Sequence, residues 1–234
     1  MAALIFICPG LAALILAFRE NRTAGIHALL SRTFDYRRIE AKAWYIPILL
    51  LMPAVMALSY ALMRRLGVAV PTLRFSVLRT ITLLVVFFLA ALGEELGWSG
   101  YAIDPMQERW SALRASILLG LFWAVFHYIP LAEAHRSLGW IAWWSLFTIA
   151  FRVLIVWIYN NTGRSVFGAA VFHSTFNITW QLFPTNGSFW DPRVTGLIMT
   201  FVALCQQNIG LFRSLEPGIE PTLPAFAKFN WAPG

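Results

Sequence analysis

Long apolar runs separated by short polar segments dominate this chain. Lipid offers no partners to backbone amides, so a segment that crosses a bilayer is a helix or a strand of a closed barrel. The runs lack the alternation that marks a barrel strand, and their lengths approach the roughly 17–25 residues that a transmembrane helix needs. The pattern therefore predicts about seven helical spans, at residues 2–18, 44–63, 75–97, 113–129, 140–159, 165–183 and 195–212.

The composition agrees with a protein embedded in lipid. The 234 residues are 59% hydrophobic and 12% charged, whereas roughly 25% of the residues in a soluble domain are charged. We predict an all-α polytopic transmembrane helical bundle in one domain, residues 1–212, with a motif-bearing core at about 78–183. The tail at 213–234 is rich in proline, which sustains neither a helix nor a strand ladder.

The N-terminal region adds two features to this pattern. The first run begins directly after Met1 without the basic leader of a secretory signal, and Pro9 and Gly10 interrupt it, so we expect a short or kinked span. The segment 19–42 is basic, yet apolar residues recur within it at helical spacing. Such a segment is typical of an interfacial amphipathic helix that lies in the headgroup layer.

The net charge of +7 is distributed in a way that indicates membrane topology. The 18 Lys and Arg residues are spread over short segments between the apolar runs rather than gathered on one face, so we predict no nucleic-acid partner. If the spans alternate strictly, more of these residues share the side of the C-terminus. By the positive-inside rule we expect the N-terminus outside and the C-terminus in the cytoplasm. The compact helices with short loops fit an integral protein of a prokaryotic cell membrane.

Two adjacent acids, Glu94 and Glu95, follow the entirely apolar stretch 85–93. An ionised side chain at mid-membrane costs roughly 2.5–3.5 kcal/mol even on lenient scales, so acids at this depth need partners or water. Adjacent carboxylates repel and burial favours the neutral form, so we expect one of them to suit general-base chemistry. The alternative is that the helix ends here and both acids lie at the interface.

Histidine and amide side chains occur in two further apolar runs. We expect His127 to lie well inside its helix, with Trp123 one turn earlier and able to stack on the imidazole. His173 and Asn177 have the same spacing, so their side chains project from one helix face. Each histidine alone is equally well explained as a satisfied core residue. Together with the acids, however, they form the inventory of an acid/base site with oxyanion donors.

Arg152 is a further charge, in the middle of the fifth predicted span. It is interpreted as a counter-ion to one of the glutamates, as a side chain that snorkels to the interface, or as a sign that the span is misplaced. These three interpretations stay open. Arg152 and Trp123 are also our candidates for substrate binding.

At these residues the sequence resembles the CPBP family of intramembrane proteases. That family includes the type II CAAX prenyl endopeptidases and bacteriocin-processing or immunity-associated (ABI) proteins. The resemblance is carried by residues 93–102, 123–127 and 173–177, whose order, spacing and helical context all agree, and it covers roughly residues 78–183. It implies a membrane-embedded hydrolase that cleaves peptide bonds in a glutamate-dependent reaction.

The resemblance also implies a role for each candidate residue. Glu94 would be the base that activates a water with help from His127, and His173 and Asn177 would form an oxyanion hole. Glu95 would be an orienting or supporting acid. The cofactor is left open: a metalloprotease with a divalent metal such as zinc is one hypothesis, with Glu94, His127 and His173 as candidate ligands, although no His-Glu-x-x-His helix occurs.

One position departs from the family's first motif, which reads Glu-Glu-x-x-x-Arg. Ser99 stands where the arginine is expected. A guanidinium can hold a carboxylate or a substrate carbonyl by two parallel hydrogen bonds, which a serine hydroxyl cannot replace. Three interpretations stay open: Arg109 or Arg152 substitutes from elsewhere, the arginine is dispensable, or this member has lost catalysis and acts by binding.

The sequence thus leaves three functional hypotheses. The first is an intramembrane endopeptidase whose partner is a peptide or protein substrate, lipidated or membrane-embedded. The second is a catalytically impaired membrane protein that binds a partner peptide or toxin in an immunity role. The third is a proton-coupled transporter that uses Glu94 and Glu95, since membrane carboxylates also serve proton relays. In each case the bundle contacts membrane lipid.

Overall fold

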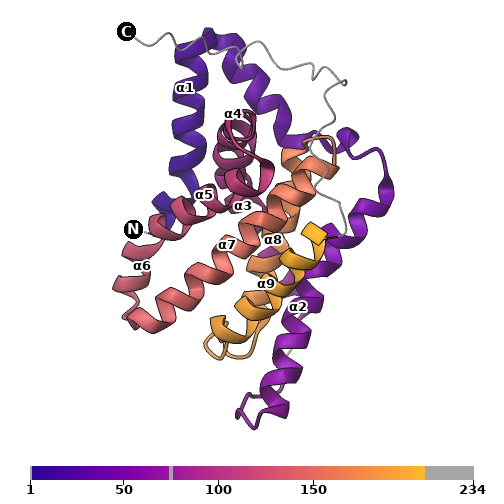
Figure 1. Ribbon diagram of the computed structural model, residues 1–234, viewed down its shortest axis with the longest axis vertical. Coiled ribbons are helices and arrows are strands. Elements are labelled where there is room, and N and C mark those ends of the chain that lie inside the picture. The colour runs from indigo at the N-terminus through magenta and orange to yellow at the C-terminus, as the bar shows by residue number, and fades with distance from the viewer. Residues whose placement is uncertain (1, 74–75, 209–234) are drawn as a thin grey trace.

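The computed structural model describes residues 2–73 and 76–208, and in these ranges the chain is helical without a strand (Figure 1). The prediction of an all-α polytopic membrane bundle is confirmed. The long helices are α1 (Ala2–Leu30), α2 (Tyr45–Arg65), α3 (Val77–Gly97), α5 (Ala112–Phe126), α7 (Leu138–Asn161), α8 (Val166–Leu182) and α9 (Pro192–Asn208). Short helices and turns join them: η1 (Ser31–Phe34), η2 (Tyr36–Arg38), η3 (Lys42–Trp44), the π-helical η4 (Trp98–Ala102), α4 (Ile103–Arg109) and α6 (Tyr128–Glu133).

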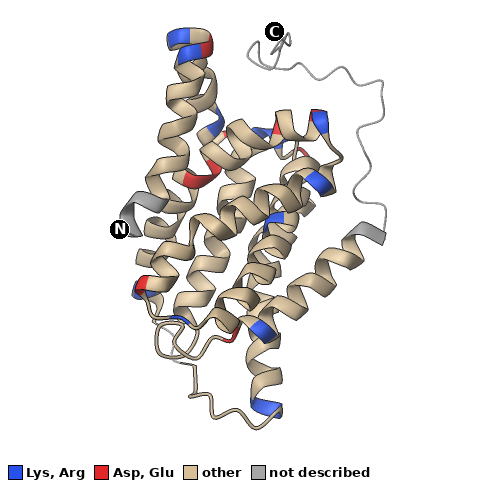
Figure 2. Cartoon of the chain, turned by 60° about the vertical axis from the view of Figure 1, so that its left-hand side comes forward, with Lys and Arg blue, Asp and Glu red and all other residues tan. Residues whose placement is uncertain are grey.

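Apolar helices of membrane-spanning length are present in the described part of the chain. Lys42–Arg65, Val77–Arg109 and Leu138–Asn161 are long and apolar enough to cross a bilayer, and Ala112–Phe126 and Pro192–Gln206 are shorter apolar helices. Charged residues gather mainly toward the helix ends (Figure 2). Most of the described part of each predicted span is helical, although the span at 113–129 is divided between α5 and α6. The number of spans that cross stays a prediction, and the end of the last run and the tail at 213–234 lie outside the described residues.

The N-terminal helix α1 folds back on itself. Its backbone is non-helical at Asn21 and Arg22, whereas the helix continues through Pro9. The kink that we expected at Pro9 therefore lies about a dozen residues further along the chain. A Cβ on Gly25 would collide with the carbonyl oxygen of Ala17, which shows how closely the returning arm packs against the first. The segment predicted to lie in the headgroup layer is therefore the return arm of a helical hairpin followed by single turns. Its depth in the membrane stays a prediction.

Close packing of α1 on α3 depends on glycine. A Cβ on Gly93 would collide with the carbonyl oxygen of Phe6, and one on Gly97 with the backbone of Pro9. Gly10 meets the backbone of Gly93 in the same way. In lipid, where helices gain little from hydrophobic burial against each other, small residues that let backbones approach are a main source of helix association. The contact covers the end of α3 that carries the two acids.

The central helix of the bundle is α7. In its most apolar window 61% of the residues are buried, compared with 17% for Val77–Arg109. Helices α5 and α9 pack against it, and α8 packs against α3 and α2 (Figure 1). Gly120 of α5 faces Ile149 and Arg152, and a Cβ on Gly120 would lie only 3.0 Å from the Cα of Ile149. This close approach places Arg152 in the interior.

Serine residues mark the start of four helices. Ser76, Ser111, Ser137 and Ser165 each accept a hydrogen bond on the side-chain oxygen from a backbone N–H three residues later. Serine is favoured at this position because its oxygen satisfies one of the N–H groups that a helix leaves unpaired. The starts of α3, α5, α7 and α8 are therefore encoded locally.

Replacing Gly93 by alanine should destabilise the fold, because the new Cβ would collide with the α1 backbone. Overpacking of this kind costs roughly 1–3 kcal/mol, and we expect the thermal unfolding midpoint of the purified protein in detergent to fall. Gly139→Ala is the matched control, since Gly139 lies in the first turn of α7 with open space around it. Equal midpoints for the two variants would contradict the close α1–α3 contact.

Candidate functional site

The two acids are buried in the last turn of α3. Glu94 is 1% exposed and Glu95 is 0% exposed. Helix α3 continues past them to Gly97 and then into the π-helical turn η4. The first part of α3 presents exposed apolar side chains such as Leu78 and Leu89, whereas its last turns are buried. Both acids are therefore buried against protein, and their depth in the bilayer stays a prediction.

Glu95 is held by donors from three elements. The Arg152 Nη1 atom of α7 lies 2.8 Å from Glu95 Oε2, and His173 Nδ1 of α8 lies 2.9 Å from Oε1. The hydroxyl of Ser99 in η4 donates to Oε2 as well. Neither side chain of the Glu95–Arg152 ion pair is exposed. Of the interpretations left open for Arg152, the structure selects the counter-ion.

Trp123 of α5 connects the remaining residues of the site. Its indole Nε1 donates to Glu94 Oε2 at 2.7 Å. Its ring centroid lies 5.7 Å from the His127 ring and 5.1 Å from the His173 ring, both edge-on. The Arg152 guanidinium lies 4.2 Å from the same centroid, in cation–π contact. Both acids and both histidines are therefore linked through one indole and one guanidinium.

The position of His127 differs from the prediction. His127 is the C-cap residue that follows the last residue of α5, Phe126, and does not lie well inside the helix. Its side chain is partly buried. The predicted span at 113–129 was too long because apolar residues continue into the separate helix α6. The His127 Nδ1 atom lies 2.8 Å from the Trp123 carbonyl oxygen. A carbonyl only accepts, so Nδ1 is the donor, and in the neutral ring Nε2 carries the lone pair.

Two further residues named from the sequence lie outside this cluster of contacts. Asn177 follows His173 by one turn on α8 and is partly buried, and no hydrogen bond of the described residues joins its side chain to the site. Arg109 is exposed at the end of α4, where its guanidinium lies over Trp110. Of the two arginines considered for the missing motif position, it is Arg152 that reaches the acids.

Comparison with known protein families matches residues 75–179 to the type II CAAX prenyl endopeptidase Rce1-like family. This range contains all three motifs and every site residue described above. Over these residues the chain is similar to the CPBP family of intramembrane proteases.

Known relatives agree with this similarity. The chain is 33% identical over 168 residues to CAAX prenyl protease 2 of Methanococcus maripaludis, which covers 65% of this chain and 61% of the relative. It is 24% identical over 207 residues to lysostaphin resistance protein A from two strains of Staphylococcus epidermidis, which covers 85% of this chain and 50% of the relatives. The chain thus spans 50–61% of the length of the relatives it matches.

The arrangement of this site does not resemble a metal cage. In the part of the chain that the structure describes, no group of three or more His, Cys, Asp or Glu side chains could hold a metal ion. His173 Nδ1 is hydrogen-bonded to Glu95, and the Arg152 guanidinium places a positive charge beside the same carboxylate. The candidate ligands Glu94, His127 and His173 do not fit a metal in this geometry, and the cofactor, for which zinc was one hypothesis, stays open.

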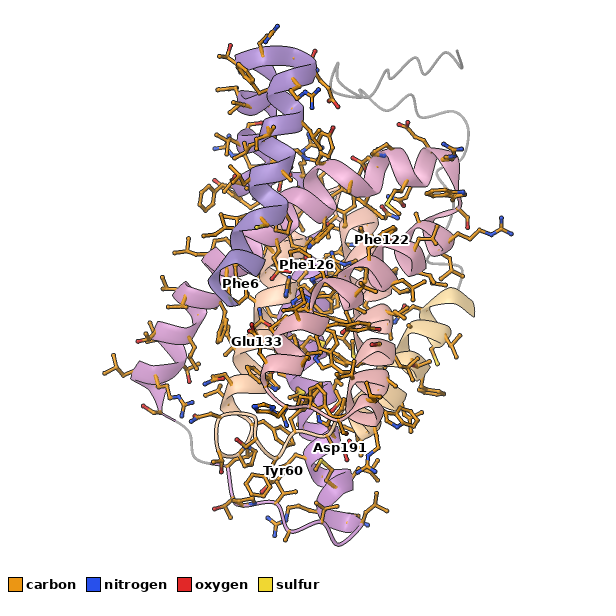
Figure 3. The ribbon with its side chains drawn as sticks, turned by 90° about the vertical axis from the view of Figure 1, so that its left-hand side faces the viewer. Phe6, Tyr60, Phe122, Phe126, Glu133 and Asp191 are labelled. Atoms are coloured by element: carbon orange, nitrogen blue, oxygen red, sulfur yellow. The ribbon has the colours of Figure 1, made fainter. Side chains whose placement is uncertain are left out.

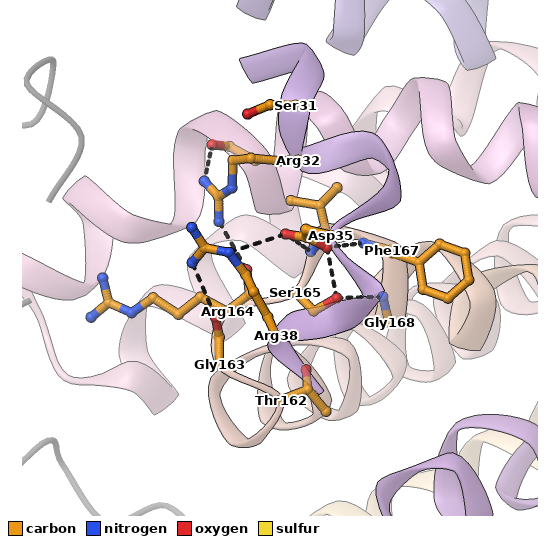
Figure 4. A network of polar contacts seen from close by, with 12 residues as sticks. Ser31, Arg32, Asp35, Arg38, Thr162, Gly163, Arg164, Ser165, Phe167 and Gly168 are labelled. Carbon is orange, nitrogen blue, oxygen red and sulfur yellow. Dashed lines mark hydrogen bonds and ion pairs between the residues drawn. The ribbon is translucent and has the colours of Figure 1, made fainter. Parts of the chain in front are cut away.

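Helix α8, which carries His173, begins on a carboxylate from the polar segment after α1. Asp35 Oδ1 accepts hydrogen bonds from the Ser165 hydroxyl at 2.7 Å and the Phe167 N–H at 3.0 Å, and its Oδ2 accepts one from the Val166 N–H at 3.3 Å (Figure 4). A negative charge at a helix N-terminus is favoured by the helix dipole and by the free N–H groups there. Asp35 therefore fixes where α8 starts.

A buried arginine holds the turn that follows the acids. Arg32 donates to the carbonyl oxygen of Gly100 in η4 at 2.7 Å, to the Tyr159 hydroxyl, and to the Arg164 carbonyl oxygen at 3.0 Å. Although burial lowers the pKa of the Arg32 guanidinium, the Tyr159 hydroxyl and the Asp104 carboxylate 3.7 Å away more than offset this and raise the pKa above its usual value. Arg32 thus stays charged.

Sequence reasoning missed Arg32 and Asp35, although both belong to the scaffold of the site. Both residues lie in a basic segment whose charges are explained just as well by contact with headgroups. Their partners are 68 to 132 residues away along the chain. The one local signal that could have indicated their role is an acid and an arginine close to apolar residues in a turn. Many surface segments share this signal, so it does not distinguish a buried role from an exposed one.

An open apolar pocket of about 410 Å³ lies between α5 and the η4–α4 segment. Trp98, Phe122 and Phe126 are among its lining residues, and Figure 3 labels the two phenylalanines on α5. Phe126 directly precedes His127, and Trp98 lies in the turn that also carries Ser99. The pocket therefore adjoins the site along both of its chain segments.

Replacing Asp35 by alanine should lower the stability of the protein, because three donors at the start of α8 lose their acceptor. Losing hydrogen bonds to a charged group costs roughly 1.5–3 kcal/mol, and thermal unfolding in detergent measures the effect. Asp35→Asn keeps one acceptor oxygen and should lie between the alanine variant and the unaltered protein. If Asp35→Ala unfolds at the same temperature as the unaltered protein, the proposed cap is not an energetic contributor.

Proposed function

We propose that this protein is an intramembrane endopeptidase in which Glu94 and His127 activate a water. The convergence of Glu94, His127 and His173 on Trp123, inside an apolar bundle, carries the proposal. Polar residues within a membrane bundle are costly and are usually functional. Similarity to a protease family supports a hydrolytic reaction over other uses of buried acids.

The first step requires a water held by two acceptors. The Trp123 N–H occupies Glu94 Oε2, so Oε1 is the oxygen able to receive a proton. His127 Nδ1 donates to a backbone carbonyl, which leaves the Nε2 lone pair of the neutral ring for the second water proton. A water held in this way presents an oxygen lone pair to a peptide carbonyl as Glu94 takes its proton.

The second requirement is a set of donors for the oxyanion. The Asn177 amide can donate directly, whereas His173 donates through Nε2 only when its ring is the imidazolium, because Nδ1 already faces Glu95. The Glu95 carboxylate stabilises that charged ring, as an orienting acid does in other hydrolases. When the tetrahedral intermediate collapses, the carbon–nitrogen bond breaks and Glu94 returns its proton to the leaving amine.

The substrate we propose is a peptide or protein that is lipidated or embedded in the membrane. CAAX prenyl protease 2, by its name, acts on prenylated CAAX sequences, and this chain shares its motif region. The apolar pocket beside Trp98 and Phe126 would receive an apolar part of such a substrate or a chain of membrane lipid. The contacts of Trp123 with Glu94 and of Arg152 with Glu95 support the proposal that both residues lie near the substrate.

Glu94→Gln should abolish cleavage, because an amide cannot take the proton from water. Loss of a general base typically lowers the rate by roughly 10²–10⁴-fold, and we expect this fall in kcat for a fluorogenic farnesylated CAAX peptide in proteoliposomes. Glu133→Gln, an exposed acid on α6, is the matched control. Cleavage by the Glu94→Gln protein at the rate of the unaltered protein would exclude Glu94 as the base.

A second candidate function is binding without catalysis, in an immunity role. It is favoured by Ser99 at the motif arginine position and by the similarity of most of the chain to lysostaphin resistance protein A. The Glu94→Gln variant separates the two functions, since a binding protein retains its protective effect in a host when the base is removed. Loss of protection together with loss of cleavage favours the endopeptidase.

We propose that the C-terminus lies in the cytoplasm of a prokaryotic cell. Arg32 and Arg164, which the charge rule assigns to the cytoplasmic side, contact each other, whereas Arg79, assigned to the opposite side, contacts the loop after α8 through Asn186. A green fluorescent protein fused to the C-terminus should fluoresce, and alkaline phosphatase at the same place should be inactive. Active phosphatase without fluorescence would reverse the orientation.

A further inference from the structure

We propose that Arg152 is a positioning residue that, together with Ser99, takes the place of the arginine missing from the first motif. The arginine of the Glu-Glu-x-x-x-Arg pattern would stand on the same helical segment as the acids, four residues after Glu95. In this protein the guanidinium comes instead from Arg152 of α7, which lies 57 residues after Glu95 in the chain. The catalytic part of this inference rests on the proposed endopeptidase function.

The contacts of Arg152 define its role. Its Nη1 donates to Glu95 Oε2 at 2.8 Å, and the Ser99 hydroxyl donates to the same oxygen. Both partners of the ion pair are fully buried, so the guanidinium neutralises a carboxylate that water cannot reach. Ser99 supplies a second hydrogen bond without a second charge. Together the two side chains deliver one positive charge and two donors.

Arg152 also acts on the other acid through Trp123. Its guanidinium lies 4.2 Å from the indole centroid, and the indole N–H holds Glu94 Oε2. A planar guanidinium can stack on a ring while it donates in its own plane, which an ammonium cannot do. One side chain therefore restrains both the carboxylate that orients His173 and the indole that orients the proposed base.

The fold prepares the position of Arg152. Gly120 lies opposite it on α5, where a Cβ would come within 3.3 Å of the Arg152 Cβ and 3.0 Å of the Ile149 backbone. The Nε and Nη2 atoms of Arg152 are buried without a hydrogen-bond partner among the described residues. The guanidinium is thus held by one carboxylate and one ring and not by hydrogen bonds to all of its N–H groups. Because so few contacts fix it to α7, an arginine at position 99 should neutralise Glu95 nearly as well.

An exchange of positions tests the proposal. Arg152→Ala should lower kcat for the farnesylated peptide roughly 100-fold with KM nearly unchanged, as expected when reacting groups are misplaced rather than when binding is lost. Adding Ser99→Arg to Arg152→Ala should recover at least about 10-fold of that loss. Arg193→Ala, which removes an exposed arginine paired with Asp191, should leave kcat unchanged and controls for loss of charge.

The thermal unfolding midpoint tests, without any substrate, whether Arg152 and Ser99 replace the motif arginine. Ser99→Arg should lower the thermal unfolding midpoint of the otherwise unaltered protein, because two guanidinium groups then compete for one carboxylate. The same substitution should raise the midpoint in the Arg152→Ala background. If Arg152→Ala does not accumulate as folded protein, recovery of folded protein in the double variant supports the proposal, and failure to recover it overturns the proposal.

The outcomes separate this inference from the proposed function. A kcat for Arg152→Ala within about twofold of the unaltered protein overturns the positioning role. A lower midpoint for Ser99→Arg in both backgrounds overturns the exchange of positions. If the unaltered protein cleaves no peptide, the endopeptidase proposal fails, and the reversal of the midpoint effect still tests whether Arg152 and Ser99 replace the motif arginine.

Discussion

The ion pair between Glu95 and Arg152 is the interaction on which the rest of the site depends. In a bundle surrounded by lipid, a fully buried carboxylate has no water to stabilise it, and removing one partner of such a pair leaves an uncompensated charge. The pair joins α3 to α7, and His173 joins α8 to the same carboxylate. Helix α3 is thereby tied at one point to α7 and α8, which follow it by more than 40 residues along the chain.

The second layer of the site is built on Trp123 rather than on charge. An indole offers one N–H and one extended ring, and here the N–H holds Glu94 while the ring contacts both histidines and Arg152. Because the surroundings are apolar, each of these interactions is stronger than it would be in water. The proposed base Glu94 and the two histidines are therefore oriented without any exposed polar scaffold.

Contacts of α1, α5 and the segment after α1 hold the residues around Glu95 and Trp123 in place. Glycines at the α1–α3 contact let the first helix cover the acids, and Gly120 lets α5 approach α7 beside Arg152. Asp35 fixes the start of α8, and Arg32 holds the carbonyl of Gly100 in the turn that carries Ser99. These contacts explain why a segment whose sequence is typical of a membrane-surface helix contributes to the interior of the bundle.

The sequence by itself determined the helices, because apolar runs of bilayer length and serine caps are local signals. It also identified Glu94, Glu95, His127, His173 and Asn177 as the residues to examine, since polar groups in apolar runs are conspicuous and the motif spacing is specific. It placed the end of α5 too late, because an apolar sequence continues past His127 whether or not the backbone stays in one helix. Only the tertiary structure decided which partner each charge has. Arg152 had three interpretations until the structure placed its guanidinium 2.8 Å from Glu95. A buried charge is satisfied by a partner close in space, and spacing along the chain does not encode which helix supplies that partner.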